Sequence, residues 1–298
     1  MTPEAVAAAL EEEGCPCAAA GIIVERRDGR WLARLPDGRM AWFARSPEGQ
    51  EILTREGRIL RLLESHCRFR APRVLHVSAA GWELREPVPG EVDPSALYHR
   101  LSADEALQRR LGGEIGEALA DQHAIPSGEL EGWLPQTVGW PLARPWLEAA
   151  LDETLPDAGL RRRIGAGLDA WSGAVDRPRS RVLAHCDLGL HNIAVEAGSD
   201  ALCGIFDYAG AALADREQDF RYLLFDRASE AMLDGALAAY ERVTGVRIDR
   251  DRVRLFNAAC AVGFLAFRKG HPPEEAWCGR TLAEDLAWTD LALARAGF

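Results

Sequence analysis

Segment 182–195 constrains the fold of this chain more than any other part of it. Its sequence is VLAHCDLGLHNIAV, in which two short apolar runs flank a polar stretch, and a third apolar run follows at 202–206. Short apolar runs bounded by polar residues predict buried strands. Because the polar residues come where the runs end, we expect Asp187, Asn192 and Asp207 to converge at one rim.

These three side chains have the chemistry that phosphoryl transfer requires. An Asp can accept the proton of an attacking hydroxyl, while an Asn and a second Asp offer hard oxygen ligands to Mg²⁺. An acid five residues before an amide, followed by another acid after a further strand, is typical of kinase active sites. Phosphoryl transfer depends more on positioning and charge neutralisation than on covalent help from the protein. The pattern therefore predicts a kinase-type site.

Composition and charge limit the partners of the chain. Its 298 residues are 48% hydrophobic and 27% charged, as in ordinary globular proteins, and they suffice for one large domain or two lobes with separate cores. The formal net charge of −11 makes nucleic acids and anionic membranes poor partners. An acidic surface suits a cationic ligand, and it equally serves solubility alone.

The N-terminus, the hydropathy and the cysteines indicate a cytoplasmic protein. Segment 1–14 is acidic and predicts a short helix rather than a signal peptide, and the sequence has no apolar run long enough to cross a bilayer. The seven cysteines are scattered without zinc-ligand spacing, which favours reduced thiols.

The order of predicted elements divides the chain in two. The first part predicts strands over 18–24, 31–35, 40–45, 72–77 and 82–85, with a turn at 36–38 and an amphipathic helix over 51–64. The Pro/Gly segment EPVPG at 86–90 reads as a hinge. Beyond it, the periodicity predicts helices over 103–123, 145–155, 159–176, 215–225, 230–244, 250–267 and 273–296.

This order and these motifs resemble the aminoglycoside phosphotransferase and choline kinase-like family of the protein-kinase-like superfamily. HCDLGLHN at 185–192 matches the family pattern His-x-Asp-x-x-x-x-Asn. Further similar segments are LADQH at 119–123, FDY at 206–208, ADREQDF at 214–220 and the hinge VPG at 88–90. The resemblance covers nearly the whole chain. It implies an α+β, two-lobed protein-kinase-like fold, with a small antiparallel β-rich lobe over 1–87 and a larger, mainly helical lobe over 88–298.

The resemblance also implies roles for the residues that match. Asp187 is expected to be the catalytic base, and Asn192 and Asp207 are expected to bind Mg²⁺. The hinge backbone from Glu86 to Val88 is expected to meet the base of ATP or GTP.

Three neighbouring residues have smaller expected roles. His185 is expected to brace the catalytic loop rather than to titrate, and Asp219 is expected to anchor that loop from the start of a helix. Asp215 is a second candidate for the same role. His191 stands where the family often has Gly, and we assign it no role.

The small lobe departs from the family pattern at the lysine that binds the nucleotide phosphates. Lys269 is the only lysine of the chain, and Arg45 stands where that lysine is expected, with Glu56 of the following helix as its expected ion-pair partner. An arginine keeps the charge and can bind phosphate in a bidentate manner. The alternative is a solvent-facing arginine at the end of a strand. Gly29 is the one glycine of the expected phosphate-covering turn.

The expected function is that of a small-molecule kinase, which transfers the γ-phosphate of ATP or GTP to a hydroxyl group. The alternative is a degenerate kinase fold that binds a nucleotide or a partner without turnover, which the missing lysine favours. The complete set of Asp187, Asn192 and Asp207 favours turnover. A protein-directed kinase is disfavoured, because the sequence has no activation-loop segment that ends in Ala-Pro-Glu.

The acceptor is expected to lie against the late helices and segment 126–145 of the large lobe. Aromatic faces can hold sugars or cations, or can simply pack helices, and the candidates are Trp133, Trp140, Trp146, Trp277 and Trp288. The predicted final helix also carries Glu274, Glu275, Glu284, Asp285 and Asp290. These carboxylates favour a hydroxylated, amine-bearing and therefore cationic acceptor, and the alternative is a solvated helix face.

Overall fold

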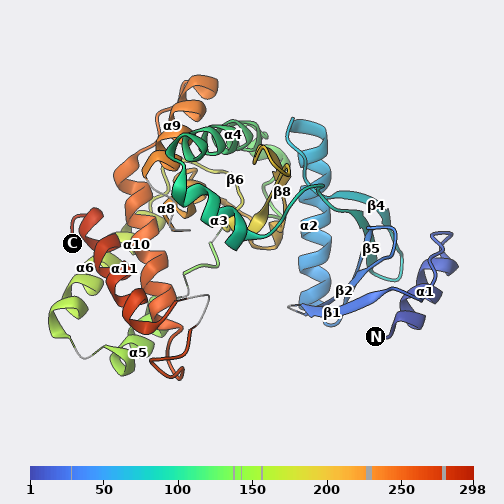
Figure 1. Ribbon diagram of the computed structural model, residues 1–298, viewed down its shortest axis with the longest axis horizontal. Helices are drawn as coiled ribbons and strands as arrows, with labels where there is room; N and C mark the ends of the chain where they lie inside the picture. Colours follow the sequence, from blue (N-terminus) through green and yellow to red (C-terminus); the bar gives the residue numbers. More distant parts are fainter. Residues whose placement is uncertain (28, 137, 142, 156, 226–229, 277–279) are drawn as a thin grey trace. The chain divides into compact units, whose positions relative to one another are not determined.

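The chain folds into two units in the computed structural model, which describes residues 1–298 except 28, 137, 142, 156, 226–229 and 277–279. The first unit joins Met1–Val92 with Asn192–Ala209, and the second joins Asp93–His191 with Gly210–Phe298. Antiparallel strands dominate the first part of the chain and helices dominate the rest, so the predicted α+β class is confirmed (Figure 1). Each unit is described by itself below.

A five-stranded antiparallel sheet forms the first unit. Its strands are β1 (Ile23–Arg27), β2 (Arg30–Arg34), β3 (Met40–Ala44), β4 (Arg73–Val77) and β5 (Trp82–Glu86), in the order β1-β2-β3-β5-β4. The predicted turn joins β2 to β3, with Gly38 at φ 87° and Asp37 Oδ1 accepting a hydrogen bond from Arg39 N at 3.0 Å. The strand predicted over 18–24 is wrong in its bounds, because the small residues of its first half form a bend and a turn before Ile23.

The alternation of side chains gives this sheet two different faces. One face is apolar and packs against α1 (Pro3–Glu12) in a cluster of Val6, Leu10, Ile22, Ala33, Leu35, Ala41, Phe43, Trp82 and Leu84. The other face carries the buried charged residues of the sheet, and α2 (Pro47–His66) contacts the strands on that side. The helix is longer at both ends than the predicted 51–64. It begins earlier because Ser46 caps its first turn through a hydrogen bond from Gly49 N at 3.2 Å.

Segment 192–209 adds a short ribbon to the first unit. In it, β7 (Ile193–Val195) pairs with β8 (Leu202–Ile205), and single bridges join Gly204 to Arg70 and Val195 to Glu91. A Cβ on Gly204 would lie 2.1 Å from the Arg70 carbonyl oxygen, so this close approach requires glycine. The sequence-based lobe boundary after residue 87 remains a prediction, and the two units differ from it by grouping this ribbon with the N-terminal part.

The second unit is mainly helical. Its helices are α3 (Pro94–Ala103), α4 (Glu105–His123), α5 (Arg144–Thr154), α6 (Ala158–Val175), α7 (Glu217–Phe220), α8 (Tyr222–Phe225), α9 (Glu230–Thr244), α10 (Arg250–Ala266) and α11 (Leu282–Arg295), and β6 (Val182–Ala184) pairs with β9 (Ala212–Ala214). The helix predicted over 273–296 begins only at Leu282, since Thr281 and Glu284 form a capping box there. The helix predicted over 215–225 is two short helices.

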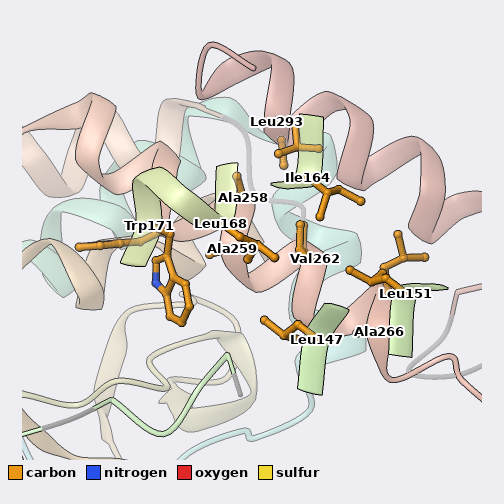
Figure 2. Packing of buried hydrophobic residues seen from close by; sticks show 14 of the residues in the cluster. Leu147, Leu151, Ile164, Leu168, Trp171, Ala258, Ala259, Val262, Ala266 and Leu293 are labelled. Atoms are coloured by element: carbon orange, nitrogen blue, oxygen red, sulfur yellow. The ribbon is translucent and has the colours of Figure 1, made fainter. Parts of the chain in front are cut away.

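Small residues allow the helices of this unit to pack closely. Alanines of α10 lie against larger apolar side chains of α5, α6 and α11, including Leu147, Leu168 and Leu293 (Figure 2). Between α4 and α9, a Cβ on Gly112 would lie 2.1 Å from a carbonyl oxygen of the facing helix. None of the helices within the described residues is long and apolar enough to span a membrane.

Candidate active site

A buried carboxylate holds the start of the predicted catalytic loop, which follows β6. Asp219 is fully buried, and its oxygens accept hydrogen bonds from His185 N at 2.9 Å and Cys186 N at 2.8 Å. Gln122 Nε2 and His123 Nε2 lie 3.0 and 3.1 Å from Asp219 Oδ2. Burial acts to raise the pKa of Asp219, but the hydrogen bond and charge of His123, the charge of His185 and the bond from Cys186 hold that pKa below its ordinary value. The predicted anchoring role of Asp219 is confirmed.

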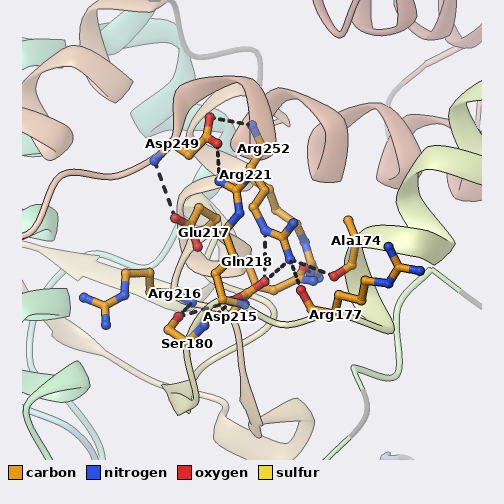
Figure 3. Close-up of polar contacts among 11 residues, drawn as sticks. Ala174, Arg177, Ser180, Asp215, Arg216, Glu217, Gln218, Arg221, Asp249 and Arg252 are labelled. Atoms are coloured by element: carbon orange, nitrogen blue, oxygen red, sulfur yellow. Dashed lines mark hydrogen bonds and ion pairs between the residues drawn. The ribbon is translucent and has the colours of Figure 1, made fainter.

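Asp215 fixes a different part of the chain. Its carboxylate accepts a hydrogen bond from Arg179 N at 2.7 Å. It also accepts from Ser180 N at 2.7 Å and from Arg252 Nε at 2.9 Å (Figure 3). Arg252 Nη2 also donates to the Ala174 carbonyl oxygen at 2.7 Å. Asp215 therefore anchors the approach to β6 rather than the loop that follows it, which corrects the second candidate.

Two further buried side chains stabilise the predicted catalytic loop. His185 is fully buried and its Nδ1 accepts a hydrogen bond from Asp187 N at 3.2 Å, so its bracing role is confirmed. Arg221 is also fully buried and donates to the Cys186 carbonyl oxygen, while its own carbonyl accepts a hydrogen bond from Asn257 Nδ2 at 3.0 Å. Cys186 has a φ of 66°, a left-handed backbone that is unfavourable for a residue with a side chain. The surrounding hydrogen bonds keep this conformation immediately before Asp187.

Asp187 presents a partly exposed carboxylate at the end of this loop. Its side chain is 44% exposed, His191 Nε2 lies 3.4 Å from its Oδ2, and Tyr222 also hydrogen-bonds to it. Burial acts to raise the pKa of Asp187. The opposing effects are larger, so this pKa lies below its ordinary value; they are the hydrogen bond from His191, the charges of His191 and His185, and the hydrogen bond from Tyr222. Asp187 is therefore ionised at neutral pH and can accept a proton from a hydroxyl group.

His191, to which no role was assigned from the sequence, and Tyr222, which no sequence pattern indicated, both contact the Asp187 side chain. Their rings are in edge contact, with centroids 6.0 Å apart and an interplanar angle of 87°. Burial raises the pKa of Tyr222 well above its ordinary value, so this hydroxyl stays protonated and can donate. The four-residue spacing from Asp187 is the signal that could have identified His191. Tyr222 comes from α8, and no local pattern links it to the loop.

Asn192 and Asp207, the predicted Mg²⁺ ligands, belong to the first unit and lie at one end of its β7–β8 ribbon. Asn192 directly precedes β7, and Asp207 follows β8 after Phe206, whose N donates to Asn192 O at 3.0 Å. Asn192 is buried and Asp207 is exposed. Asp207 has a φ of 65°, a second left-handed residue at a predicted site position. The ribbon thus brings both oxygen-bearing side chains to the same end.

This pair of side chains fits Mg²⁺. One carboxylate and one amide are hard oxygen donors, and Mg²⁺ is usually held by one or two such protein ligands together with waters and substrate phosphates. Within the described parts of the chain, no group of three or more His, Cys, Asp or Glu side chains could hold a metal ion. The donor set of Asn192 and Asp207 therefore suits a metal that arrives with a phosphorylated substrate.

The predicted ion pair between Arg45 and Glu56 is wrong. Glu56 lies buried on α2 and pairs with Arg30 Nη1 of β2 and Arg85 Nη1 of β5, each at 2.9 Å. Arg45 is exposed, and its guanidinium lies 4.7 Å from the centroid of the Trp31 ring. The reason is strand alternation: residues 41 and 43 of β3 face the α1 side, and residue 45 continues that parity, away from α2.

The two arginines that pair with Glu56 belong to a buried network of ion pairs, which also includes Glu83. Their guanidinium carbons lie 4.8 Å (Arg30) and 5.7 Å (Arg85) from the centroid of the Trp42 ring, and Arg85 Nη2 also pairs with Glu83 Oε2 at 2.8 Å. Burial acts to raise the pKa of Glu56, but the charges of Arg85 and Arg30 hold it below its ordinary value. Burial raises the pKa of Glu83.

The predicted base-binding segment, Glu86 to Val88, lines a cavity of about 530 Å³ in the first unit. The other walls come from the last turns of α2, from residues 67–73 and from Pro89. Glu86 pairs with Arg73 at 3.0 Å at its exposed rim. The volume suits a small organic molecule. Base binding by the Glu86–Val88 backbone remains a prediction.

Most carboxylates that were expected to attract a cationic acceptor are already paired. Asp285 is fully buried and pairs with Arg280 Nε at 2.6 Å and with Arg268 Nε at 3.5 Å. Glu284 accepts a hydrogen bond from the N-cap of α11 at 2.7 Å, and Asp290 pairs with an arginine of α6. Two further carboxylates are exposed but precede α11 instead of lying on it, namely Glu274 and Glu275. Trp277 lies outside the described residues.

Comparisons with solved structures agree with this architecture. A comparison with curated proteins finds no match. Among solved structures, the chain is similar to the GDP complex of wild-type aminoglycoside 2'-phosphotransferase-IIIa, with a TM-score of 0.71, 19% identity and 100% of each chain covered. It is also similar to a macrolide 2'-phosphotransferase from Brachybacterium faecium, with a TM-score of 0.63, 21% identity and 98% of each chain covered. A streptomycin–ATP ternary complex of an aminoglycoside phosphotransferase gives a TM-score of 0.58 and 14% identity over 92% of this chain and 93% of that one.

These likenesses establish the fold alone, since each identity is low. The family model described as the phosphotransferase enzyme family matches residues 22–256, which is well over half of the chain. The matched region contains the loop with Asp187 and the ribbon with Asn192 and Asp207. The chain therefore belongs to the phosphotransferase enzyme family.

Proposed function

We propose that this protein is a small-molecule kinase, which transfers the γ-phosphate of ATP or GTP to a hydroxyl group of its acceptor. The observation that carries the proposal is the ionised, partly exposed Asp187 at the end of a loop that three buried side chains hold in place. Membership of the phosphotransferase family supports it. The complexes of similar structures with GDP, and with ATP and streptomycin, support a purine nucleotide as the phosphate donor.

In the proposed reaction, Asp187 accepts the proton of the acceptor hydroxyl. The hydroxyl oxygen bonds to the γ-phosphorus, the bond from that phosphorus to the bridging oxygen breaks, and the nucleoside diphosphate leaves. His191 and Tyr222 orient the Asp187 carboxylate and keep it ionised. Asn192 and Asp207 would hold Mg²⁺, which when bound neutralises charge on the phosphates.

The nucleotide would use residues of the first unit. The backbone from Glu86 to Val88 would meet the base. Arg45 is exposed, and its N donates to Gly29 O at 2.8 Å, so it lies beside the turn that is predicted to cover the phosphates. Glu56 would act indirectly, by holding Arg30 and Arg85 against the sheet.

A second candidate is a kinase fold that binds a nucleotide without turnover. The buried network favours it, because Glu56 pairs with two arginines that are themselves only 4% and 3% exposed, and not with a lysine. Mg²⁺-dependent release of ADP or GDP, measured over a panel of hydroxylated acceptors, separates the candidates. Kinase activity requires acceptor-dependent release that disappears in Asp187→Asn. Nucleotide binding in calorimetry with no acceptor-dependent release from any compound would favour the second candidate.

A further inference from the structure

An arginine of the first unit reaches the segment that carries Asp207, one of the two predicted Mg²⁺ ligands. Arg55 lies on α2, directly before Glu56, and its Nη2 donates a hydrogen bond to the Ala209 carbonyl oxygen at 3.1 Å. Ala209 follows Asp207 by two residues and belongs to the same unit as α2. The contact therefore holds the Arg55 guanidinium beside the backbone that continues from the predicted metal site.

The charge of Arg55 is not neutralised by the part of the protein that the structure describes. Among those residues, no carboxylate lies within ion-pair distance of its guanidinium, and the Ala209 carbonyl is its one hydrogen-bond partner. Arg55 is half-buried, and its Nε is fully buried without a hydrogen-bond partner in the same described residues. Arg30 and Arg85, in contrast, both pair with Glu56. A half-buried cation that is held only by a neutral carbonyl favours an anion as its ligand.

The place of Arg55 in the first unit suits a phosphate group of the nucleotide. The lysine expected at the phosphates is missing, Arg45 continues the strand parity that faces away from α2, and the other two arginines near α2, Arg30 and Arg85, are almost fully buried. Mg²⁺ at Asp207 would take phosphate oxygens among its remaining ligands. Phosphates that share a metal with Asp207 come to the end of the ribbon at which Arg55 is held. A guanidinium binds phosphate strongly, through N–H groups that point in one plane.

We propose that Arg55 binds the nucleotide phosphates in this protein and supplies the positive charge of the expected lysine. Nη2 stays on the Ala209 carbonyl and fixes the guanidinium, while Nη1 donates to a non-bridging phosphate oxygen. Arg30 and Arg85 then serve the packing of the sheet and do not contact the nucleotide. The proposal names a residue for the phosphate donor of the proposed kinase, and it rests on that function.

Nucleotide binding tests the role of Arg55 without requiring turnover. ATP or GTP, whichever binds more tightly, and the corresponding nucleoside are titrated into the full chain by calorimetry, once with Mg²⁺ and once with EDTA in its place. Arg55→Ala should weaken triphosphate binding about tenfold to a hundredfold under both conditions, as expected for the loss of a hydrogen bond to a charged group, and should leave nucleoside binding unchanged. Arg55→Lys, which keeps the charge, should recover part of the affinity.

The matched control is Arg61→Ala. This variant removes the same charge from an exposed residue of the same helix, and it should bind the triphosphate like the wild type. Thermal unfolding of each variant shows whether it is folded. Arg55→Met keeps the length of the apolar stem without the charge, and it provides the same comparison if Arg55→Ala does not fold.

The outcomes separate a phosphate contact from a structural role. A loss of triphosphate affinity that requires Mg²⁺ would mean that Arg55 only positions Asp207, and an equal loss for the nucleoside would mean a general disturbance of the fold. Either result overturns the proposal, and so does wild-type affinity of the Arg55 variants. Triphosphate binding that depends on Arg55, without phosphorylated product from any hydroxylated acceptor, overturns the kinase function and leaves the role of Arg55 intact. A wild-type protein that binds neither triphosphate overturns both.

Discussion

Replacing Asp219 with Asn tests whether the buried anchor of the catalytic loop controls activity. Asn has the same shape but only one acceptor oxygen, while the Asp219 carboxylate accepts from His185 N and Cys186 N on different oxygens, at 2.9 and 2.8 Å. Whichever way the amide turns, its NH₂ group faces at least one backbone N–H. An unsatisfied buried donor costs about 1–3 kcal/mol, and bonds to a charged acceptor lie at the upper end of that range.

The expected result is lower stability together with lower activity of the protein that remains folded. We expect a loss of about 2–3 kcal/mol in the free energy of unfolding, which corresponds to a decrease of roughly 5 °C in Tm for a chain of this size. Since Asp187 follows the anchored residues directly, kcat should fall at least about tenfold, as expected for a misplaced catalytic group. Thermal unfolding and steady-state kinetics at a temperature where both proteins are folded provide the two measurements.

Asp215→Asn is the matched control for this experiment. Asp215 is also a buried carboxylate, but its two backbone donors, Arg179 N and Ser180 N, share Oδ1, and its Oδ2 pairs with Arg252, so it anchors residues 179 and 180 rather than the loop. The variant therefore loses the charge of the Arg252 pair. It should reduce stability similarly while the folded enzyme keeps most of its kcat. Equal kcat for Asp219→Asn and the wild type would refute the anchoring argument, and so would an equal loss of kcat in both variants.

The pH dependence of stability gives an independent check on Asp219. Its folded-state pKa lies below the unfolded value, so its contribution is fully present above the unfolded pKa and is lost as pH falls through the folded pKa. The difference in stability between the wild type and Asp219→Asn should therefore shrink in acid. A difference that is constant from neutral pH down to acid would contradict an ionised anchor.

Four further predictions concern the remaining site residues. Asp187→Asn should abolish turnover and leave Mg²⁺–nucleotide binding largely intact, which single-turnover kinetics and nucleotide titration can check. Asp207→Ala should remove metal-dependent nucleotide binding, and Asn192→Ala should weaken that binding less, because only Asp207 carries charge. Calorimetry with and without Mg²⁺ measures both effects. Arg45→Ala should raise the nucleotide KM, with partial recovery in Arg45→Lys; equal KM values for all three proteins would identify Arg45 as an ordinary surface residue. His191→Ala should raise the pKa of Asp187, so the acid limb of the kcat/KM profile should move to higher pH, and an unmoved limb would contradict the His191 contact.

Local sequence order was enough to predict the parts of the site that lie on one short segment. The apolar runs around Asp187 and Asn192 fixed where strands end, and the pairing of β7 with β8 brings Asp207 to the end that Asn192 occupies. The small antiparallel sheet, its single long helix and the later helices also followed from periodicity. These features depend on neighbours along the chain, so hydropathy patterns contain them.

The missed features depend on which face a residue occupies and on contacts between distant segments. Arg45 was placed by its position along the third strand, whereas a shift of one residue moves a side chain to the opposite face. Arg30 and Arg85, which pair with Glu56, come from strands on either side of β3. Only the order of strands in the sheet brings them together, and the sequence alone does not contain that order.

The net charge of the sequence also could not predict whether a cationic acceptor can bind, because it does not show which carboxylates are already paired. A formal charge of −11 favoured a cationic acceptor only if the carboxylates of the last helix were available. Asp285 is instead buried between Arg268 and Arg280, at a position where a polyamine cannot reach it without displacing an arginine. Breaking such a buried pair would leave an uncompensated charge and cost several kcal/mol, which is more than the screened attraction of an exposed amine can supply. For Asp285, its pairing with two arginines, rather than the total charge of the chain, therefore decides whether a cationic acceptor can bind to it.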